Sequence, residues 1–327
     1  MAFEPYKAKE NPVKRKTPRI GPLPYTDDWF EDRRSTIGAS EAASVCGVSR
    51  YAQPLEIFNR KRHGEESREQ TKAQRRGHIF ESAVLQLYGD RVGGRMMRNC
   101  PMLVHPTWAF MSATPDAIWH PEESQSPTCF DILESDSIPV DAKTTQLWNE
   151  FGDEGSDDIP QEYIFQAQQQ MAVTGAPRCD LPVLRSGSFD VSIYSVARNE
   201  DLIEIIREAE QEMMDRIKND DPPEPNWEHP KTYEVIRKTM CNVVEQSSVV
   251  LDEHLQELWD ESKAMASERT QIEKEIKKRK AKILYALGEN AIGCLPDGRQ
   301  LVRKKIHVSA REVPASEYVR LDCKKGS

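Results

Sequence analysis

The first part of the chain alternates between helix-like and strand-like patterns of apolar residues. Apolar positions recur at three- and four-residue steps in Arg68–Gly89, Pro160–Thr174 and Asp201–Lys218, which predicts three amphipathic helices. Asp28–Arg34 and Pro54–Arg62 have the composition of two shorter helices. These segments are the predicted helices before residue 220.

Short apolar runs bounded by turn residues lie between these helices and predict β-strands. The runs are Met102–His105, Ala109–Ser112, Ala117–His120, Phe130–Glu134, Ile138–Thr144, Leu181–Leu184 and Phe189–Val196. Strands interleaved with helices in this order predict an α/β fold, with a central mixed sheet flanked by helices.

A third pattern begins after the proline-rich segment Asp220–Pro225, which we interpret as a linker. Apolar residues follow a heptad-like spacing across Ser247–Leu287, which predicts one long helix or an antiparallel helix pair. We interpret this stripe as packing within the chain rather than as an oligomer interface, and the basic run Lys277–Lys280 as a solvated face. Asp297–Gly298 predicts the turn of a β-hairpin.

These patterns predict three parts: a flexible polar arm at residues 1–24, the α/β core at 25–220, and a helical and β-hairpin extension at 221–327. The arm lacks the apolar segment of a secretory signal. No run in the sequence approaches the roughly 20 apolar residues that span a bilayer. We therefore expect a cytoplasmic protein without membrane contact.

Composition narrows the chemistry. The 327 residues are 30% charged and 38% hydrophobic, with a net charge of −9. This acidic balance does not itself indicate nucleic acid, although a locally basic cleft can lie on an acidic protein. The seven cysteines are odd in number and include no C-x-x-C pair, which argues against a disulfide framework, a zinc site or an iron–sulfur cluster.

Three acidic residues and one lysine carry the candidate chemistry. Asp141 and Lys143 are two positions apart in a predicted strand, so we expect their side chains on one face of it. Asp116 and, further upstream, Glu81 precede them. Carboxylates beside an ammonium group suit a divalent metal that holds a phosphate, with a cation near the attacking water.

Five blocks in a fixed order are similar to a known family. They are Trp29-x-x-x-Arg33 with Ile37–Glu41, then Arg76–Glu81, Ser112–Asp116, Asp141–Thr144 and Tyr163–Met171. On these blocks, roughly residues 25–218 of the chain resemble the YqaJ and lambda-exonuclease group of phage-type exonucleases, within the PD-(D/E)xK nuclease superfamily. The resemblance implies a PD-(D/E)xK restriction-endonuclease-like core.

The resemblance also implies roles for the metal-binding residues. Asp116 and Asp141 are expected to ligate the metal ions, together with the backbone carbonyl of Ala142. Glu81 is expected to hold a second metal, directly or through water. Lys143 is expected to orient or activate the attacking water, with a pKa lowered by the neighbouring metals.

Other family positions concern the DNA. Gln166 is expected to steady the nucleophile or the scissile phosphate. Arg33 and Ser40 match positions that hold a 5′-phosphate, and Tyr163 is expected to contact DNA. Ser40 also has the chemistry of an N-cap for a helix that begins near Glu41, and the two roles are compatible.

The implied activity is that of a Mg²⁺-dependent DNA exonuclease, with Mn²⁺ as a substitute, which digests one strand of duplex DNA from an end in the 5′→3′ direction. The family further implies phage-type recombination in a bacterial or phage-infected host cell, a ring-shaped homotrimer, and a single-strand annealing protein as partner. Two alternatives stay open: an endonuclease on the same core, and a catalytically silent DNA-binding module.

Several positions also have simpler interpretations. Asp116 after Pro115 can be a turn residue, and Glu81 a solvated helix residue. Asp141–Lys143 can be an exposed pair on a strand. We expect Gln168–Gln170 on an ordinary polar helix face.

Three features depart from the family pattern. Asp141 stands where a glutamate is usual, and Ala117 follows Asp116 where a glycine is usual. Glu122–Ser137 has the composition of an inserted loop or hairpin. The insertion affects the expected strand register rather than the identity of the ligands.

Overall fold

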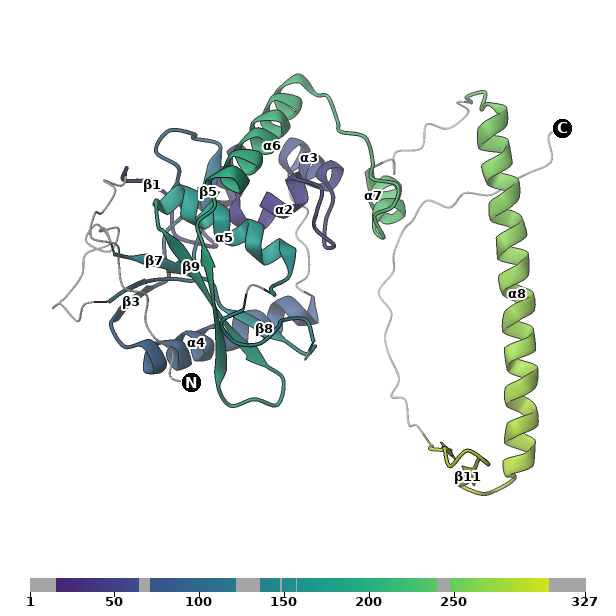
Figure 1. The fold of residues 1–327 in the computed structure, drawn as a ribbon. Helices are drawn as coiled ribbons and strands as arrows, with labels where there is room; N and C mark the ends of the chain where they lie inside the picture. The colour runs from purple at the N-terminus through teal and green to yellow at the C-terminus, as the bar shows by residue number, and fades with distance from the viewer. Residues whose placement is uncertain are drawn as a thin grey trace. The chain divides into compact units, whose positions relative to one another are not determined.

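The computed structural model describes residues 16–64, 71–121, 136–147, 149–156, 158–239 and 248–305. The chain divides into two compact units, Met1–Thr239 and Met240–Ser327. The first unit contains the core that the sequence predicts, and the second contains the long helix and the hairpin of the extension (Figure 1).

The helices of the first unit include all five that were predicted before residue 220, whereas the helix Thr232–Thr239 was not predicted. They are α1 (Asp27–Ser35), the 3-10 turn η1 (Ala39–Glu41), α2 (Ala42–Val45), α3 (Pro54–His63), α4 (Lys72–Val92), α5 (Gln161–Thr174), α6 (Glu200–Asn219) and α7 (Thr232–Thr239). Local capping fixes several ends: the Asn199 side chain accepts a hydrogen bond from the Leu202 amide at the start of α6, and Thr26 does the same for Trp29 at the start of α1.

The strands of the first unit are short. They are β1 (Arg19–Ile20), β2 (Ile37–Gly38), β3 (Arg95–Arg98), β4 (Leu103–Val104), β5 (Met111–Ala113), β6 (Ala117–His120), β7 (Ile138–Val140), β8 (Lys143–Thr145), β9 (Arg178–Arg185) and β10 (Val191–Ala197). Of the predicted strands, Phe130–Glu134 lies outside the described residues, as does most of the segment Glu122–Ser137.

The strands form a central six-stranded sheet and a smaller four-stranded sheet. The central sheet runs β10-β9-β7-β6-β3, with β8 paired beside β9. β7 and β8 are parallel to β9, whereas β9–β10, β6–β7 and β3–β6 are antiparallel, so the sheet is mixed. The smaller sheet has the order β1-β4-β5-β2. The predicted α/β class with a central mixed sheet between helices is confirmed.

The two faces of the central sheet are covered by different helices, and β9 shows why. Cys179 and Val183 pack with Met171 of α5 on one face. On the opposite face, the Tyr88 hydroxyl of α4 donates a hydrogen bond of 2.8 Å to Asp180 Oδ2. Alternate side chains of a strand point to opposite faces, which places α5 and α4 on either side of the sheet (Figure 1).

The predicted flexible arm is wrong for its described part. β1 pairs with β4 in antiparallel register, Arg19 with Val104 and Ile20 with Leu103. The Gly21 amide then donates to the Met102 carbonyl at 2.7 Å. Arg19 and Ile20 therefore belong to the smaller sheet, because the backbone of this polar segment pairs with β4. Residues 1–15 lie outside the described part of the chain.

The first unit ends at Thr239 instead of at residue 220, so the proline-rich segment is not its boundary. Polar contacts hold the segment that follows against the loop before α3. The Asn226 amide donates to Gln53 Oε1 at 2.9 Å, and Gln53 Nε2 donates to Thr232 Oγ1 at 3.0 Å. β3 was also not predicted, because its sequence Arg-Met-Met-Arg lacks a β-branched or aromatic signal.

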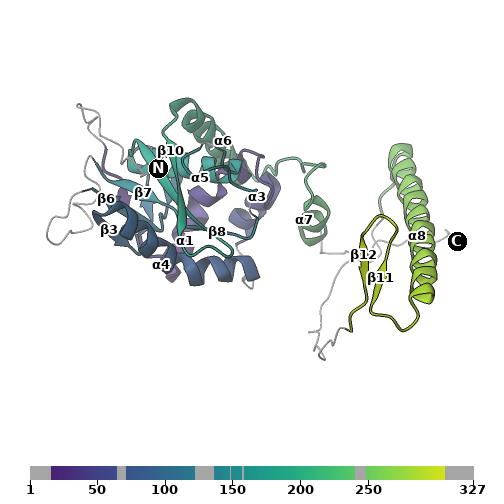
Figure 2. The same ribbon diagram turned by 60° about the horizontal axis from the view of Figure 1, so that its bottom comes forward.

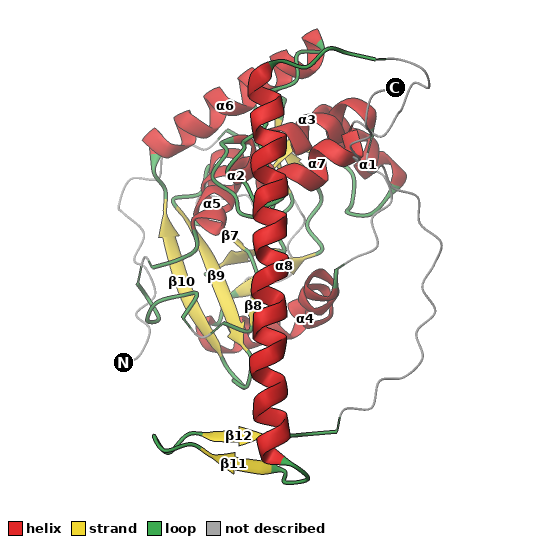
Figure 3. Ribbon diagram, turned by 90° about the vertical axis from the view of Figure 1, so that its right-hand side faces the viewer, coloured by secondary structure: helices red, strands yellow, loops and turns green. Residues whose placement is uncertain are grey.

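The second unit contains α8 (Glu253–Leu287) and a hairpin of β11 (Ile292–Cys294) with β12 (Gln300–Val302) (Figures 2 and 3). α8 is one uninterrupted helix, which decides between the two predicted arrangements. Asp252 caps it by accepting a hydrogen bond of 2.9 Å from the Leu255 amide. The predicted Asp297–Gly298 turn joins the two strands, with Gly298 at φ +86°. None of the described helices has the length and apolar character needed to cross a bilayer.

Candidate active site

Asp116 and Asp141 meet where strands of the central sheet end. Asp116 lies between β5 and β6, and Asp141 follows β7. The Ala142 amide donates to Asp116 Oδ2 at 2.8 Å, and the Asp141 amide donates to the Asp180 carbonyl at 3.0 Å. The predicted continuous strand Ile138–Thr144 is therefore broken at Asp141–Ala142, because Ala142 bonds to a side chain instead of to a neighbouring strand.

Asp141 and Lys143 nevertheless contact each other as the sequence predicts. Lys143 Nζ forms an ion pair with Asp141 Oδ2. Gln166 of α5 bridges the pair: its Nε2 donates to Asp141 Oδ1 at 2.9 Å, and its Oε1 accepts from Lys143 Nζ at 3.2 Å. Gln170 Nε2, one turn further along α5, donates to the same Asp141 oxygen at 3.1 Å. We call Asp116, Asp141, Lys143 and Gln166 the acidic centre.

Tyr163 belongs to the support of this centre. Lys143 Nζ lies 4.9 Å from the centroid of its ring, and the ring stacks on Phe151 at 5.8 Å between centroids. The cation therefore rests on an aromatic face, which stabilises a charge held away from water. Tyr163 is only partly buried, and its predicted contact with DNA stays a prediction.

The charges of the acidic centre act strongly on one another. Burial and the neighbouring charge of Asp141 raise the pKa of Asp116 well above its ordinary value. Burial opposes the charge of Lys143, but Asp141 and Asp116 outweigh it and raise the lysine pKa. The lowered pKa that we predicted depends on neighbouring metal ions and stays a prediction.

Glu81 stands apart from the two aspartates. Its side chain on α4 is 36% exposed and lies 4.0 Å from His78 Nδ1. Burial and the charge of Asp141 raise its pKa, while His78 and Lys143 act in the opposite direction. Within the described residues, no three His, Cys, Asp or Glu side chains are close enough to hold an ion as they stand. Direct ligation by Glu81 thus stays a prediction.

The donor atoms of the acidic centre fit a hard divalent cation. Asp116 and Asp141 supply carboxylate oxygens at the same turn as the Ala142 carbonyl, and hard cations take oxygen ligands. Burial beside each other disfavours ionisation of both carboxylates, and a bound cation relieves that repulsion.

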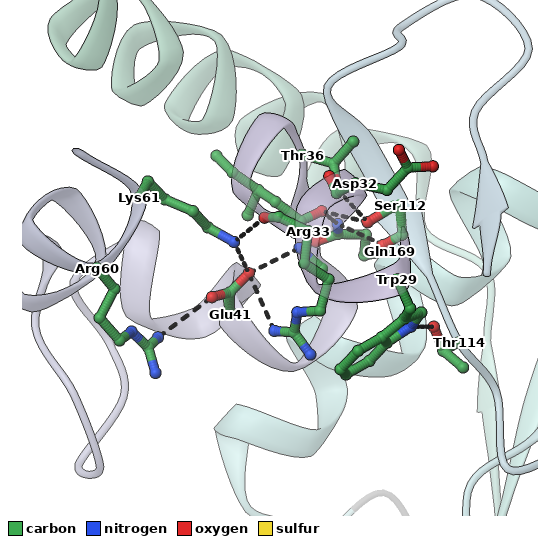
Figure 4. Close-up of polar contacts among 12 residues, drawn as sticks. Trp29, Asp32, Arg33, Thr36, Glu41, Arg60, Lys61, Ser112, Thr114 and Gln169 are labelled. Carbon is green, nitrogen blue, oxygen red and sulfur yellow. Dashed lines mark hydrogen bonds and ion pairs between the residues drawn. The ribbon is translucent and has the colours of Figure 1, made fainter. Parts of the chain in front are cut away.

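A second charged cluster surrounds Glu41 in η1 (Figure 4). Glu41 is 3% exposed and accepts from Lys61 Nζ at 2.7 Å, Arg60 Nη2 at 3.2 Å and the Gly38 amide at 2.9 Å. Arg33 Nη2 lies 3.3 Å from the same carboxylate. Burial alone raises the pKa of Glu41, but the three cations lower it to about 2. We call Glu41, Arg33, Arg60 and Lys61 the cationic centre.

Ser40 lies within the η1 turn and is exposed, so the predicted N-cap role is wrong. The turn begins after Gly38, whose amide is taken by the Glu41 carboxylate. Ser40 is therefore an exposed residue directly before Glu41, the carboxylate of the cationic centre. The predicted phosphate role of Ser40 stays open for its side chain.

Two aromatic residues lie between the acidic and cationic centres. The Arg33 guanidinium lies 4.9 Å from the centroid of the Trp29 ring, and Trp29 Nε1 donates to Thr114 Oγ1 at 3.5 Å (Figure 4). Tyr25 tilts against Trp29 at 5.4 Å. Burial, then Glu81 and Asp116, raise the pKa of Tyr25, and Arg33 lowers it. Tyr25 is therefore within electrostatic reach of both centres.

Part of the chain matches a known protein family. Residues 28–177 match the family model of the YqaJ-like viral recombinase domain. This part of the chain is similar to the YqaJ-like viral recombinase family. The resemblance predicted from the five sequence blocks is thereby confirmed.

The relatives of the YqaJ-like domain include one curated protein and several solved structures. The chain is 27% identical over 196 residues to the uncharacterized protein YqaJ of Bacillus subtilis (strain 168), which covers 57% of this chain and 54% of that protein. The chain thus spans about half the length of this relative. An alkaline exonuclease (LHK-Exo) from Laribacter hongkongensis is 20% identical, with 60% of this chain and 94% of that one covered and a TM-score of 0.46. A phage-related exonuclease from Haemophilus somnus 129PT is 14% identical, with 57% and 96% covered and a TM-score of 0.40.

The positions of three glutamines in α5 show that our expectation of an ordinary polar helix face was wrong. Gln168, Gln169 and Gln170 are buried instead of lying on a solvated polar face. Gln168 Nε2 donates to the Ala197 carbonyl at 2.7 Å, and Gln169 Nε2 donates to the Ile37 carbonyl at 2.8 Å. These hydrogen bonds tie α5 to the surrounding backbone.

The contact of Gln170 with Asp141 and the ion pairs of Glu41 with three cations were not predicted from the sequence. The spacing of four between Gln166 and Gln170 was a usable signal, because residues i and i+4 lie on one helix face. Glu41 had no comparable signal, since its cations come from α1 and α3.

Proposed function

We propose that this chain is a Mg²⁺-dependent DNA exonuclease that digests one strand of duplex DNA from an end, in the 5′→3′ direction, during phage-type recombination. The observation that carries the proposal is the bridged triad of Asp141, Lys143 and Gln166 beside Asp116. A buried carboxylate that shares an amine and an amide with its neighbours is costly for stability alone, and it suits a hydrolytic site.

Asp116, Asp141 and the Ala142 carbonyl are the residues that would hold Mg²⁺, or Mn²⁺ in its place, with Glu81 acting through water. When bound, the metal supplies charge relief on the phosphate and lowers the pKa of a coordinated water. Gln166 orients Asp141 and Lys143 through its two hydrogen bonds.

Lys143 has its own part in the reaction. Its ammonium group places a positive charge beside the phosphate that is cleaved, and it orients the attacking water. Tyr163 and Gln166 hold that group in position, so little rearrangement is needed when the substrate binds.

The cationic centre supports the preference for a DNA end. Three cations around one carboxylate leave two positive charges uncompensated, which suits a phosphate dianion. We assign the 5′-phosphate to Arg33 and Ser40. Arg33 is 23% exposed and is held between Glu41 and the Trp29 ring, so its guanidinium is positioned before a ligand arrives.

The deciding experiment is digestion of one sequence as linear duplex and as closed circle, each with Mg²⁺ and with chelator. We expect Mg²⁺-dependent loss of the linear form only. Cleavage of the closed circle identifies an endonuclease on the same core, and no cleavage of either form with Mg²⁺ or Mn²⁺ identifies a silent DNA-binding module. Linear duplexes with a 5′-phosphate or a 5′-hydroxyl then test the end preference, and labelled strands test the polarity.

Two further elements of the proposal rest on the family resemblance alone. They are a homotrimer of nuclease cores that encircles the product strand, and an annealing protein that binds that strand. Sedimentation of the full chain with and without duplex DNA tests the first, and co-purification with a candidate annealing protein tests the second.

A further inference from the structure

α8 carries an apolar stripe that nothing in the described part of its own unit covers. None of its residues is buried. The stripe consists of Leu255, Leu258, Met265, Ile272, Ile276 and Ile283, with exposed fractions between 43% and 66%. A single helix in water gains nothing from six exposed aliphatic side chains in register, so the stripe indicates a binding surface.

The stripe has the spacing of a coiled-coil seam with polar interruptions. Its positions alternate by three and four residues from Leu255 to Ala286. Ser262, Arg269 and Arg279 occupy three of these positions in place of apolar residues. Polar residues at seam positions specify which partner and which register are tolerated.

The charges of α8 are divided between its two halves. Residues 252–268 carry six acidic and one basic side chain, whereas residues 269–287 carry seven basic and two acidic. Two copies of the helix side by side in parallel place like charges together along their whole length. Two antiparallel copies place each acidic half against a basic half.

The seam positions make the same distinction. In a parallel pair, Arg269 and Arg279 each face their own counterparts across the seam. In an antiparallel pair centred between residues 270 and 271, Leu258 faces Ile283 and Met265 faces Ile276. Apolar positions then meet apolar ones in these layers.

The polar positions also pair in this antiparallel register. Ser262 faces Arg279, and Leu255 faces the small Ala286. Only the central layers, Arg269 against Ile272, are mixed. Long arginine side chains leave a seam by extending their charged ends to water, so these layers cost little.

We propose that α8 binds α8 of a second copy of this chain as an antiparallel coiled coil in this register. Glu261 of each helix flanks Lys282 of the other, which gives two equivalent ion pairs. Glu268 flanks Glu275, whose charge is already balanced by Arg279 at 3.0 Å and Lys278 at 3.6 Å.

The pairing has a consequence for the arrangement of two chains. A helix of 35 residues is roughly 50 Å long at 1.5 Å per residue. Because the copies run in opposite directions, their first units are connected at opposite ends of the paired helices. The interface therefore joins two first units independently of any contact between those units themselves.

Disulfide cross-linking of the full chain tests the register directly. Leu258→Cys and Ile283→Cys are prepared separately in a Cys294→Ser background, oxidised alone and as an equal mixture, and the linked peptides are identified by mass spectrometry. We expect the 258–283 disulfide in the mixture and no self-link in either variant alone. Self-links at 258–258 and 283–283 indicate a parallel pair and overturn the proposal. Absence of every such link shows that another surface covers α8, which also overturns it.

Further substitutions in the same cross-linking mixture test whether the link depends on the apolar stripe or on α8 as a whole. Ile276→Asp puts a charge in the seam and should lower the yield of the 258–283 link at least tenfold. The control Gln271→Asp adds the same charge outside the stripe and should leave the yield within about twofold. Circular dichroism checks that both variants keep the helix, and equal losses in both overturn the interface.

A charge exchange tests the flanking pairs. Lys282→Glu places two glutamates together and should lower the yield roughly threefold to tenfold at low salt. Glu261→Lys combined with Lys282→Glu should restore it, because opposite charges meet again. Failure of the double variant to recover contradicts this register. Rates of DNA digestion measure the proposed nuclease separately, since no α8 residue belongs to that site.

Discussion

The two charged centres of the first unit are both built from carboxylate and cationic side chains, but the excess charge has the opposite sign in each. In the acidic centre, two aspartates share one ammonium group, and Gln166 bridges Asp141 to Lys143. In the cationic centre, one glutamate is shared by two guanidinium groups and one ammonium group. With every group ionised, the surplus is one negative charge in the first and two positive charges in the second. The raised pKa of Asp116 shows that the protein alone resists the negative surplus, which a bound cation would stabilise.

The surplus decides what each centre attracts. Buried ions of one sign require partners of the other, so the acidic centre favours a cation and the cationic centre favours an anion. Trp29 contacts Arg33 at one side and Thr114 at the other, close to Asp116 in sequence. The proposed function accordingly assigns the divalent metal to the acidic centre and the phosphate to the cationic centre.

The largest expected effect is the loss of hydrolysis in Lys143→Ala. The change removes the only cation of the acidic centre, so turnover on linear duplex DNA should fall roughly a thousandfold. DNA affinity, measured by fluorescence anisotropy with chelator, should change less than about threefold because the cationic centre is intact. The exposed Lys218→Ala on α6 is the control and should keep full activity. Retained turnover in Lys143→Ala contradicts the assignment of the acidic centre.

Glu41→Gln should produce the next largest effect, on stability. The amide keeps the shape of the side chain but leaves three cations without their charge partner. The free energy of unfolding at pH 7 should fall by about 3 kcal/mol, below the upper range for buried pairs because Arg33 and Arg60 are partly solvated. Urea denaturation followed by tryptophan fluorescence measures it. Glu204→Gln, which removes an exposed ion pair with Arg207 on α6, should leave the midpoint unchanged.

The same glutamate should show its charge in the pH dependence of stability. Its pKa is lowered from 4.5 to about 2 in the folded chain, so its stabilisation is fully present above pH 4.5 and is lost as the pH falls toward 2. The difference in free energy of unfolding between the wild type and Glu41→Gln, about 3 kcal/mol at pH 7, should therefore narrow steadily between pH 4.5 and pH 2. A difference that is constant across this range contradicts an ionised Glu41.

Most of the acidic centre could be predicted from the sequence, because its residues lie in short blocks with recognisable spacing. Asp141 and Lys143 meet as their separation predicts, although the strand between them is broken. The break depends on Asp116, which is distant in sequence and takes the Ala142 amide that a strand needs. Periodicity describes neighbours along the chain and does not include such a side-chain acceptor.

Less of the cationic centre could be predicted, because its contacts also join residues that are distant in sequence. Arg33, Glu41 and Lys61 lie on three separate elements, and each alone has the sequence context of a surface residue. Helices α5 and α6 were predicted well, because their apolar periods are long and regular. β1 was not, because two residues of a polar segment carry no period, and backbone pairing with β4 decides their structure.

The last and smallest expected effect on the free energy of unfolding is that of Glu210→Gln, whose pH dependence should run opposite to that of Glu41→Gln. Glu210 of α6 is also fully buried, yet burial and then the charge of Glu41 raise its pKa well above the ordinary value. Its carboxyl group therefore keeps its proton to a higher pH in the folded chain than in the unfolded chain, so the group costs stability as the pH rises above 4.5. The difference in free energy of unfolding between Glu210→Gln and the wild type should therefore move in favour of the variant as the pH rises from 4 to 7, the reverse of the trend for Glu41→Gln. A loss at pH 7 as large as that of Glu41→Gln would mean that the two buried glutamates carry the same charge, and the distinct surplus of the cationic centre would then disappear.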